Sequence, residues 1–217
     1  MLTRLILAVS LFLASGGACR LGAEVRGKID MLVADGLVIT MDPARRVLDH
    51  GAVAVRGDRI VAVGTPAELK ARYSPRQTVS AAGSIVLPGL VNTHNHAPMV
   101  LFRGIANDLR LMDWLENYIY MATLGGAQAL GLEKDIGSLE AGKKADLILV
   151  DAEVPAALPL FDPYAKLVYS LKGGAVRTSI INGRLVMRDR GVLTVDEAAV
   201  RNKARDYQKK IAASLGR

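Results

Sequence analysis

The stretch Val86–Met99, VLPGLVNTHNHAPM, holds two of the three histidines in this chain. Side chains at positions i and i+2 of a strand point to the same side, so His94 and His96 at a strand end can face one ion. Imidazole suits zinc, iron, nickel or copper, and a catalytic zinc usually has three protein ligands and a water. Such a metal lowers the pKa of its bound water toward 7 and so supplies hydroxide. The pair is therefore a candidate corner of a metal site.

Apolar runs typical of strands precede the histidines. Residues 28–64 predict a small antiparallel sheet, with turns at Asp35-Gly36 and at Arg56-Gly57-Asp58. Thr65 as N-cap and Pro66 at the first helical position predict a helix over residues 65–73. Residues 84–94 predict an apolar strand that Pro88-Gly89 interrupts, with its second half buried on both faces.

Helices and then further strands are expected after the histidines. The spacing of apolar residues predicts helices over 112–120 and 122–132, the second ending near Gly131. Strands are predicted over 145–151 and 166–171, followed by a hairpin that turns at Asn182-Gly183. Thr194 and Glu197 form a capping-box pattern, which predicts a closing helix to about Leu215.

Longer motifs carry a family resemblance. The stretch around the histidines resembles the first-strand signature of the amidohydrolase superfamily, and LFRGIANDLRLMDWLENYI (residues 101–119) resembles its branch of 5-methylthioadenosine/S-adenosylhomocysteine deaminases and chlorohydrolases. Residues 121–151, which include GSLEAGKKADL, and residues 161–190 are similar to the closing helix and return strands of that branch. The resemblance runs from about residue 28 to 215, in the order of the family.

The resemblance implies a mixed, mainly β fold: a β-sandwich formed by both chain ends, with a (β/α)8 barrel between them. A complete barrel of this type takes about 250 residues, whereas this chain has 217 in all. We therefore expect only a barrel remnant, with the first strand and about two helices. The expected division begins with a signal peptide over residues 1–23 and the first half of the sandwich over 24–87. The barrel remnant follows over 88–132. The second half of the sandwich, with the closing helix, spans 133–217.

The resemblance also implies one divalent metal at His94 and His96, with zinc as the first expectation and iron or manganese as alternatives. Trp114 is a candidate for lining a substrate pocket. The later histidine ligands, the aspartate and the acid/base glutamate of the family have no counterpart, and Thr123 stands near the position of a substrate-contacting glutamate. Asp108, Asp113 and Glu116 match no catalytic position, and His50 is expected at a surface turn.

The implied activity is metal-dependent hydrolysis of a carbon–nitrogen bond outside peptides, such as deamination of a purine-like ring in a small molecule. Because most catalytic residues lack a counterpart, we expect this chain to be catalytically incomplete. The alternatives are a non-catalytic sandwich or oligomerisation module, or a chain that another chain completes. Leu90, Val91 and the Trp114 face should then be only partly covered, and such apolar surface could join two copies.

Charge and hydropathy argue against two classes of partner, nucleic acids and a membrane that the chain would span. The formal net charge is +7, but the basic residues do not cluster in a binding motif. The segment richest in basic residues, 201–210, is expected to be a solvated helix face rather than a nucleic-acid site. The apolar run over residues 5–14 is too short to span a bilayer, so no transmembrane span is expected.

The N-terminus has the pattern of an export signal, with a positive charge, an apolar run and small residues before a cleavage region. We therefore expect export, to the periplasm or outside the cell, with a cytoplasmic location as the alternative. Cys19, the single cysteine, is an alternative site of lipid attachment, although Gly16 stands where such a signal has an aliphatic residue.

Overall fold

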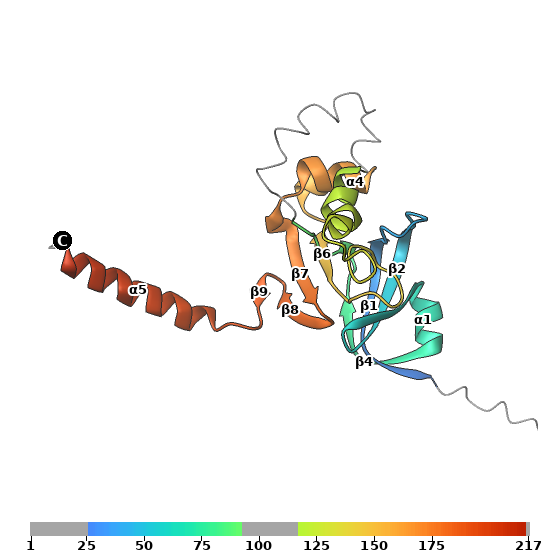
Figure 1. Ribbon diagram of the computed structural model, residues 1–217, viewed down its shortest axis with the longest axis horizontal. Helices are drawn as coiled ribbons and strands as arrows, with labels where there is room; N and C mark the ends of the chain where they lie inside the picture. The colour runs from blue at the N-terminus through green and yellow to red at the C-terminus, as the bar shows by residue number, and fades with distance from the viewer. Residues whose placement is uncertain (1–25, 93–116, 216–217) are drawn as a thin grey trace, which may run out of the picture.

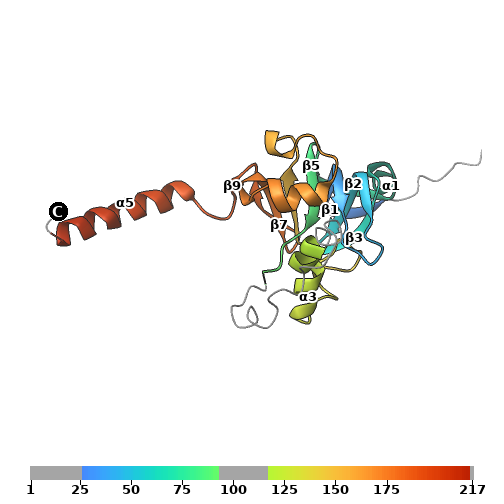
Figure 2. The same cartoon turned by 90° about the horizontal axis from the view of Figure 1, so that it is seen from above.

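The computed structural model describes residues 26–92 and 117–215, so predictions on residues 1–25 and 93–116 lie outside the described residues. Figures 1 and 2 show a β-rich body from which the C-terminal helix extends. The elements, in chain order, are β1 Gly27–Ile39, β2 Val47–Arg56, β3 Arg59–Gly64, α1 Pro66–Arg72, β4 Tyr73–Ser80, β5 Ser84–Pro88, η2 Met121–Gly125, α3 Gly126–Ala129, β6 Leu147–Asp151, η3 Pro155–Ala157, α4 Pro163–Ala165, η4 Lys166–Ser170, η5 Gly173–Ala175, β7 Val176–Ile181, β8 Arg184–Arg188, β9 Gly191–Val192 and α5 Glu197–Ser214.

All of these strands belong to one sheet. Its order is β3-β2-β1-β5-β6-β7-β8-β9, and β4 pairs in parallel with the first part of β1. The antiparallel pairing of β5 with β6 joins the strands that precede residue 92 to those that follow residue 117. The expectation of a mainly β fold built from both parts of the chain is therefore confirmed.

The predicted turn at Asp35-Gly36 is wrong, because β1 continues through it. Asp35 has a φ of 71°, and the register with β2 shifts between Ala34 and Gly36 and again before Val38. A residue with positive φ in a strand is typical of a bulge, which bends the strand without ending it. The bend lets Ala34 and the residues before it pair with β4 while Leu37 and Val38 pair with β5.

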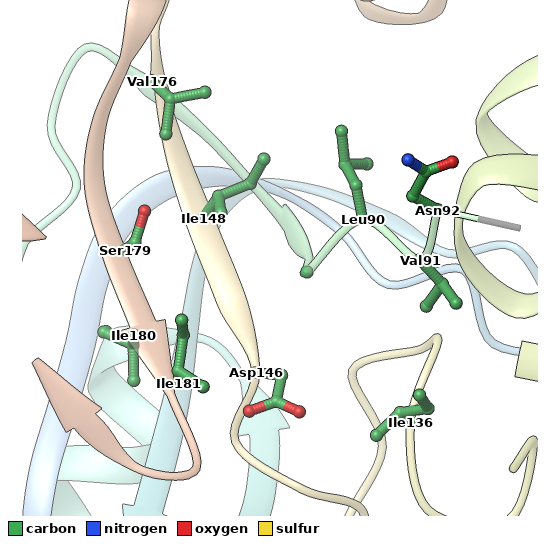
Figure 3. A pocket seen from close by; sticks show the side chains of 11 residues that line it. Leu90, Val91, Asn92, Ile136, Asp146, Ile148, Val176, Ser179, Ile180 and Ile181 are labelled. Carbon is green, nitrogen blue, oxygen red and sulfur yellow. The ribbon is translucent and has the colours of Figure 1, made fainter. Parts of the chain in front are cut away.

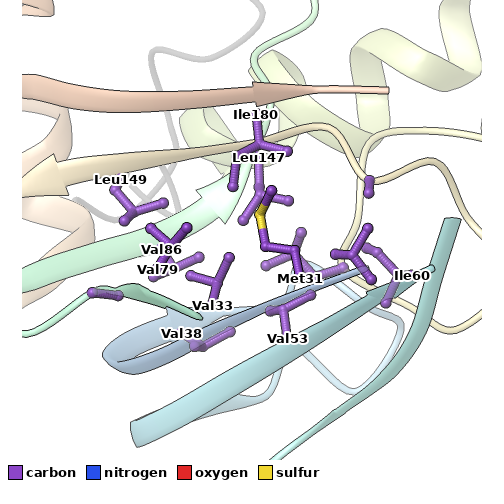
Figure 4. Close-up of a cluster of buried hydrophobic side chains, with 14 residues drawn as sticks. Met31, Val33, Val38, Val53, Ile60, Val79, Val86, Leu147, Leu149 and Ile180 are labelled. Carbon is purple, nitrogen blue, oxygen red and sulfur yellow. The ribbon is translucent and has the colours of Figure 1, made fainter. Parts of the chain in front are cut away.

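The main core lies inside this curved sheet. Figure 4 shows side chains from β1 and β2 facing those from β5, β6 and β7 across a common interior. Strands before the histidines and strands after them thus contribute to one cluster. Its buried members are Met31, Val33, Val38, Val53, Val55, Ile60, Val79, Ala81, Val86, Leu139, Ala145, Leu147, Leu149 and Ile180.

Short helices cover the outer faces of the sheet. Leu69 of α1 packs with Leu32 and other apolar residues of β1 and β2 in a second cluster. The predicted start of α1 is confirmed, since the Thr65 hydroxyl accepts from Glu68 N and the Glu68 carboxylate accepts from Thr65 N. These hydrogen bonds hold the pKa of Glu68 below its ordinary value. The helical segments around Ile119 and Tyr164 cover the other outer face, over β5 and β6.

The strand predicted over residues 166–171 is wrong, because this segment is helical. Pro163 stands at the start of α4, and the Asp162 carboxylate accepts a hydrogen bond from Tyr164 N at 2.9 Å. A proline in the first turn together with an aspartate cap favours a helix. The helix continues from α4 into η4, so local capping prevails over the β-branched and aromatic residues of the segment.

The C-terminal predictions are confirmed except for one cap. The hairpin of β7 and β8 turns at Asn182-Gly183, with φ values of 53° and 73°. The helix α5 ends near Leu215 as predicted, but its N-cap is Asp196 rather than Thr194. The Asp196 carboxylate accepts from Ala199 N at 3.0 Å, because aspartate is itself a strong cap and stands nearer the first helical turn.

A buried carboxylate organises the connection between β1 and β2. The Asp42 side chain is 6% exposed, and it accepts from Arg46 Nε at 2.6 Å and from Arg46 N at 3.1 Å. Burial by itself raises the pKa of Asp42, but the hydrogen bonds from Arg46 outweigh that effect and hold the pKa below its ordinary 3.8. The same turn accepts a hydrogen bond at Thr40 O from Leu139 N at 2.7 Å, so it also anchors the later part of the chain.

Replacing Asp42 with asparagine is expected to lower the free energy of unfolding at neutral pH by about 1–3 kcal/mol, through loss of the charged hydrogen bonds. Because the folded-state pKa is below the unfolded one, this stabilisation is present above about pH 5 and is lost as the pH falls through 3.8 toward the folded pKa. The difference between wild type and D42N should therefore shrink in acid. Urea unfolding at several pH values measures it.

The exposed Asp35 in β1 provides the control, because D35N makes the same chemical change on the surface. Asparagine tolerates the positive φ of that position. We expect D35N to change stability by less than about 0.5 kcal/mol. A D42N effect equal to that of D35N, or one that grows in acid, would contradict the role assigned to Asp42.

Candidate functional site

The chain leaves β5 toward the histidine pair along residues 89–92. Gly89 N donates to Asp146 O at 2.9 Å, and Val91 N donates to Ala122 O at 2.8 Å. The predicted second half of the strand is therefore wrong over the described residues, because Val91 hydrogen-bonds a helical segment and pairs with no strand. Leu90 is 58% exposed and Val91 is half-buried, which confirms the expectation that both are only partly covered.

A helix runs across the junction at Tyr120 and Met121. Residues 117–129 are continuously helical, so the two predicted helices form one in this region, and Gly131 follows its end with a φ of 70°. The Thr123 hydroxyl is buried and donates to Ile119 O at 2.6 Å. The Thr123 side chain therefore makes its hydrogen bond within the helix itself.

This helix packs closely against the segment that leads to the histidines. A Cβ atom on Gly126 would lie 2.9 Å from Val91 O and 3.0 Å from the Val91 Cβ. Only a glycine permits such an approach without a shift of the backbone. The Val91 contact fixes the position of the last described residues before the histidine pair.

An apolar hollow lies beside this entry. Figure 3 shows Leu90 on one side of it and Ile148 and Val176 on the other, with the Asp146 carboxylate at one end. Its volume is about 590 Å³, which is within the range of small-molecule pockets. The lining residues are Gly89, Leu90, Val91, Asn92, Ile136, Asp146, Ile148, Val176, Ser179, Ile180 and Ile181.

Ion pairs border the hollow at its Asp146 end. Arg59 Nη1 lies 2.6 Å from Asp135 Oδ1, and Lys144 Nζ hydrogen-bonds the Asp58 carboxylate. The Lys144 hydrogen bond holds the pKa of Asp58 below its ordinary value, and the hydrogen bond to Asp135 raises the pKa of the Arg59 guanidinium. These charges pair with one another, so their role is to hold the loop of residues 132–146 against the turn between β2 and β3.

Most of the predicted site residues lie outside the part of the chain that the structure describes. His94, His96 and Trp114 lie outside the described residues, as do Asp108, Asp113 and Glu116. Within the described part of the chain, no three histidine, cysteine, aspartate or glutamate side chains form a cluster that could hold a metal ion. His50 is exposed, as expected, although it lies in strand β2 rather than at a turn. Among the described helices, none is long and apolar enough to cross a membrane.

The sequence did not reveal the walls of the hollow. Ile148, Val176 and Ile180 come from β6 and β7, which pair antiparallel far along the chain from the histidines. Their alternation predicts strands but not which face meets Leu90. The one local signal is Asp146, which directly precedes the apolar run of β6 and whose Oδ1 accepts from Asn182 N.

Two family models match this chain. Residues 111–186 match the amidohydrolase family. Residues 51–73 match the imidazolonepropionase-like composite domain of bacteria. This second match covers the end of β2, all of β3 and α1. Strands β2 and β3 belong to the same sheet as the strands within residues 111–186.

Curated relatives match parts of this sequence. The chain is 48% identical over 94 residues to a 5-methylthioadenosine/S-adenosylhomocysteine deaminase from Syntrophus aciditrophicus, which covers 43% of this chain and 21% of the relative. It is 42% identical over 139 residues to the enzyme of that name from Moorella thermoacetica, which covers 59% of this chain and 32% of the relative. The chain thus spans about a fifth to a third of these relatives.

The fold is similar to that of a solved deaminase structure. An adenosine deaminase from Xanthomonas campestris with bound zinc matches with a TM-score of 0.70 and 17% identity, over 87% of this chain and 100% of that chain. At this identity the likeness concerns the fold alone. This likeness supports the expectation of a mainly β fold.

Proposed function

We propose that this chain is the sandwich part of a metal-dependent hydrolase that deaminates a purine-like ring in a small molecule. The observation that carries the proposal is the identity of 48% to a 5-methylthioadenosine/S-adenosylhomocysteine deaminase, in a chain that folds into one shared sheet. We assign residues 24–87 and 133–217 to the sandwich, and residues 88–132 to a remnant of a (β/α)8 barrel.

The described residues do not complete a metal site. Asp146 is the acidic side chain that lines the hollow, and its Oδ1 accepts the Asn182 N–H. With no three-residue donor cluster in residues 26–92 or 117–215, His94 and His96 would hold a metal with two protein ligands from this part of the family motif. A catalytic zinc usually has three. We therefore propose that the chain by itself binds metal weakly and does not turn over substrate.

The hollow suits one face of a flat ring. Leu90, Ile148 and Val176 offer apolar contact, while Asp146 and Ser179 offer polar atoms at the same cavity. Pockets for small ligands commonly combine an apolar lining with a few polar groups that set the orientation. In this proposal the hollow holds the apolar part of the substrate next to the entry to the histidine pair.

The test measures metal and ammonia on the purified chain. Zinc content after dialysis is expected to be well below one per chain, and no ammonia should appear with 5'-methylthioadenosine as the probe. Weak zinc binding followed by calorimetry should disappear in a His94→Ala/His96→Ala double variant and persist in the control His50→Ala, because His50 is an exposed residue of β2.

The outcomes separate the parts of the proposal. One tightly held zinc per chain with ammonia release would show that the chain is a complete enzyme, which contradicts the proposed incompleteness. Zinc binding that is unaffected by the double variant would contradict the assignment of the histidines.

A second candidate function is that of a module completed by another chain. The observation that favours it is the exposure of large apolar side chains on the segments next to the hollow: Leu90 is 58%, Met121 is 51% and Leu130 is 55% exposed. Exposed apolar groups of this kind mark interaction sites when they are contiguous. Ammonia release that appears only when a barrel-bearing relative is added would favour this candidate.

A further inference from the structure

The helix α5 stands apart from the sheet. Figures 1 and 2 show it extending away from the body, and none of its residues is buried. A hydrogen bond of 3.4 Å from Val192 N to Glu197 Oε1 lies at its base. An amphipathic helix of 18 residues normally packs its apolar stripe against another surface, because most of the stability of helices in proteins comes from packing of the apolar face.

One side of α5 is an apolar stripe. Its members recur at intervals of three or four residues, which places them on one face of a helix. The large side chains of this stripe are each more than half exposed, from 55% for Val200 and Tyr207 to 64% for Leu215. The stripe consists of Val200, Ala204, Tyr207, Ile211 and Leu215.

Cations border the stripe on both sides. The helical spacing places Arg201 and Arg205 along one edge and Lys203 and Lys210 along the other. The helix carries five basic and two acidic side chains, and one of the acids, Glu197, pairs with Arg201 at 3.2 Å. Lys210 Nζ lies 5.6 Å from the centre of the Tyr207 ring. An apolar stripe between two cationic edges is complementary to a surface that is anionic above and apolar below.

We propose that α5 binds in the plane of an anionic lipid surface, with the stripe in the boundary between headgroups and acyl chains. Long basic side chains can then reach outward to lipid phosphates while their stems cover apolar surface. Pairing of α5 with α5 of a second copy is disfavoured because it would bring the cationic edges of two helices together. This proposal is independent of the catalytic one, because it uses none of the residues that line the hollow.

The test uses the full chain and vesicles of phosphatidylcholine with or without phosphatidylglycerol. Binding by flotation is expected with the anionic vesicles at low salt and should weaken as salt is added. Ile211→Asp should weaken binding by about tenfold or more, because it places a charge in the buried stripe. Ala213→Asp is the control: it adds the same charge on the opposite side of the same turn and should weaken binding much less.

A second readout separates α5 from the apolar N-terminal run, which could itself contact lipid. In a Trp114→Phe background, Tyr207→Trp places the single tryptophan on the stripe. Its emission should shift to the blue on addition of anionic vesicles and stay unchanged with phosphatidylcholine alone. Circular dichroism of each variant checks that the helix is retained.

Several results would overturn the proposal. These are equal binding of Ile211→Asp and Ala213→Asp, no emission shift at Tyr207→Trp with anionic vesicles, or a shift that depends on protein concentration without lipid. The last result would assign the stripe to a second copy of the chain. Emission shifts produced by an acidic protein but not by vesicles would likewise replace the lipid surface with a protein partner.

Discussion

Replacing Gly183 with alanine is expected to lower the free energy of unfolding by about 3 kcal/mol or more. A Cβ atom at this position would lie 2.0 Å from Gly57 O and 3.0 Å from Asp58 Cα. Both obstacles are backbone atoms of the turn between β2 and β3, which cannot rotate away as a side chain can. The turn between β7 and β8 would therefore have to separate from the turn between β2 and β3.

The loop of residues 132–146 makes this contact important, because it hydrogen-bonds both turns. Ala145 N donates to Asp58 O at 2.8 Å, and Gly183 N donates to Ala145 O at 3.0 Å. If the turns move apart to relieve the clash, both of these hydrogen bonds are stretched. The substitution should weaken the connection between strands that are far apart in sequence.

Gly131 provides a matched control for Gly183. It has a φ of 70°, close to the 73° of Gly183, but a Cβ atom there would meet nothing within 4 Å. Gly131→Ala should therefore cost only the strain of a left-handed backbone, about 1–2 kcal/mol. Urea unfolding followed by circular dichroism measures both variants. Equal losses of stability would show that the two turns do not touch as described.

Replacing Leu147 with alanine is expected to cost about 2–5 kcal/mol of unfolding free energy, since it removes buried methyl groups and leaves a cavity. Leu147 is 0% exposed and lies in the cluster between the two parts of the curved sheet, as Figure 4 shows. Strands from before and after the histidine pair meet there. Thermal and urea unfolding should each show a single transition, because the parts share one core. The midpoint temperature and the midpoint urea concentration should both be lower than in the wild type.

Leu130→Ala is the control for this change. Leu130 is 55% exposed, so the same truncation removes little buried surface and should cost less than about 1 kcal/mol. Two separate unfolding transitions in Leu147→Ala would indicate that the parts of the sheet fold independently. That result would contradict the shared core.

Several local features follow from neighbouring residues, and those predictions are confirmed. Thr65 and Glu68 cap α1, and Asn182-Gly183 forms the turn between β7 and β8. In both cases the energy comes from residues within a few positions of one another, such as a cap hydrogen bond or a positive φ. These signals need no knowledge of the rest of the chain.

The wrong predictions involve residues whose neighbours come from elsewhere in the chain, or segments where two local signals compete. Asp35-Gly36 is a turn signal, but here the positive φ bends β1 so that it can pair with both β4 and β5. In residues 166–171 the apolar pattern suggested a strand, while Asp162 and Pro163 start a helix. Because such a pattern alone does not identify the winning signal, only the structure could settle these segments.

The sequence by itself determined the family resemblance, the mainly β fold and the candidate metal pair, because motifs such as GSLEAGKKADL and the histidine spacing are local patterns. The tertiary structure decided which strands share a core, where the hollow lies and which helix stands uncovered. Ile148 and Leu90 border the same hollow only because β5 pairs with β6. A motif consists of residues that are close together in the sequence, so the sequence alone reveals it. Burial depends on contacts between residues that are far apart in the sequence, so only the tertiary structure shows it.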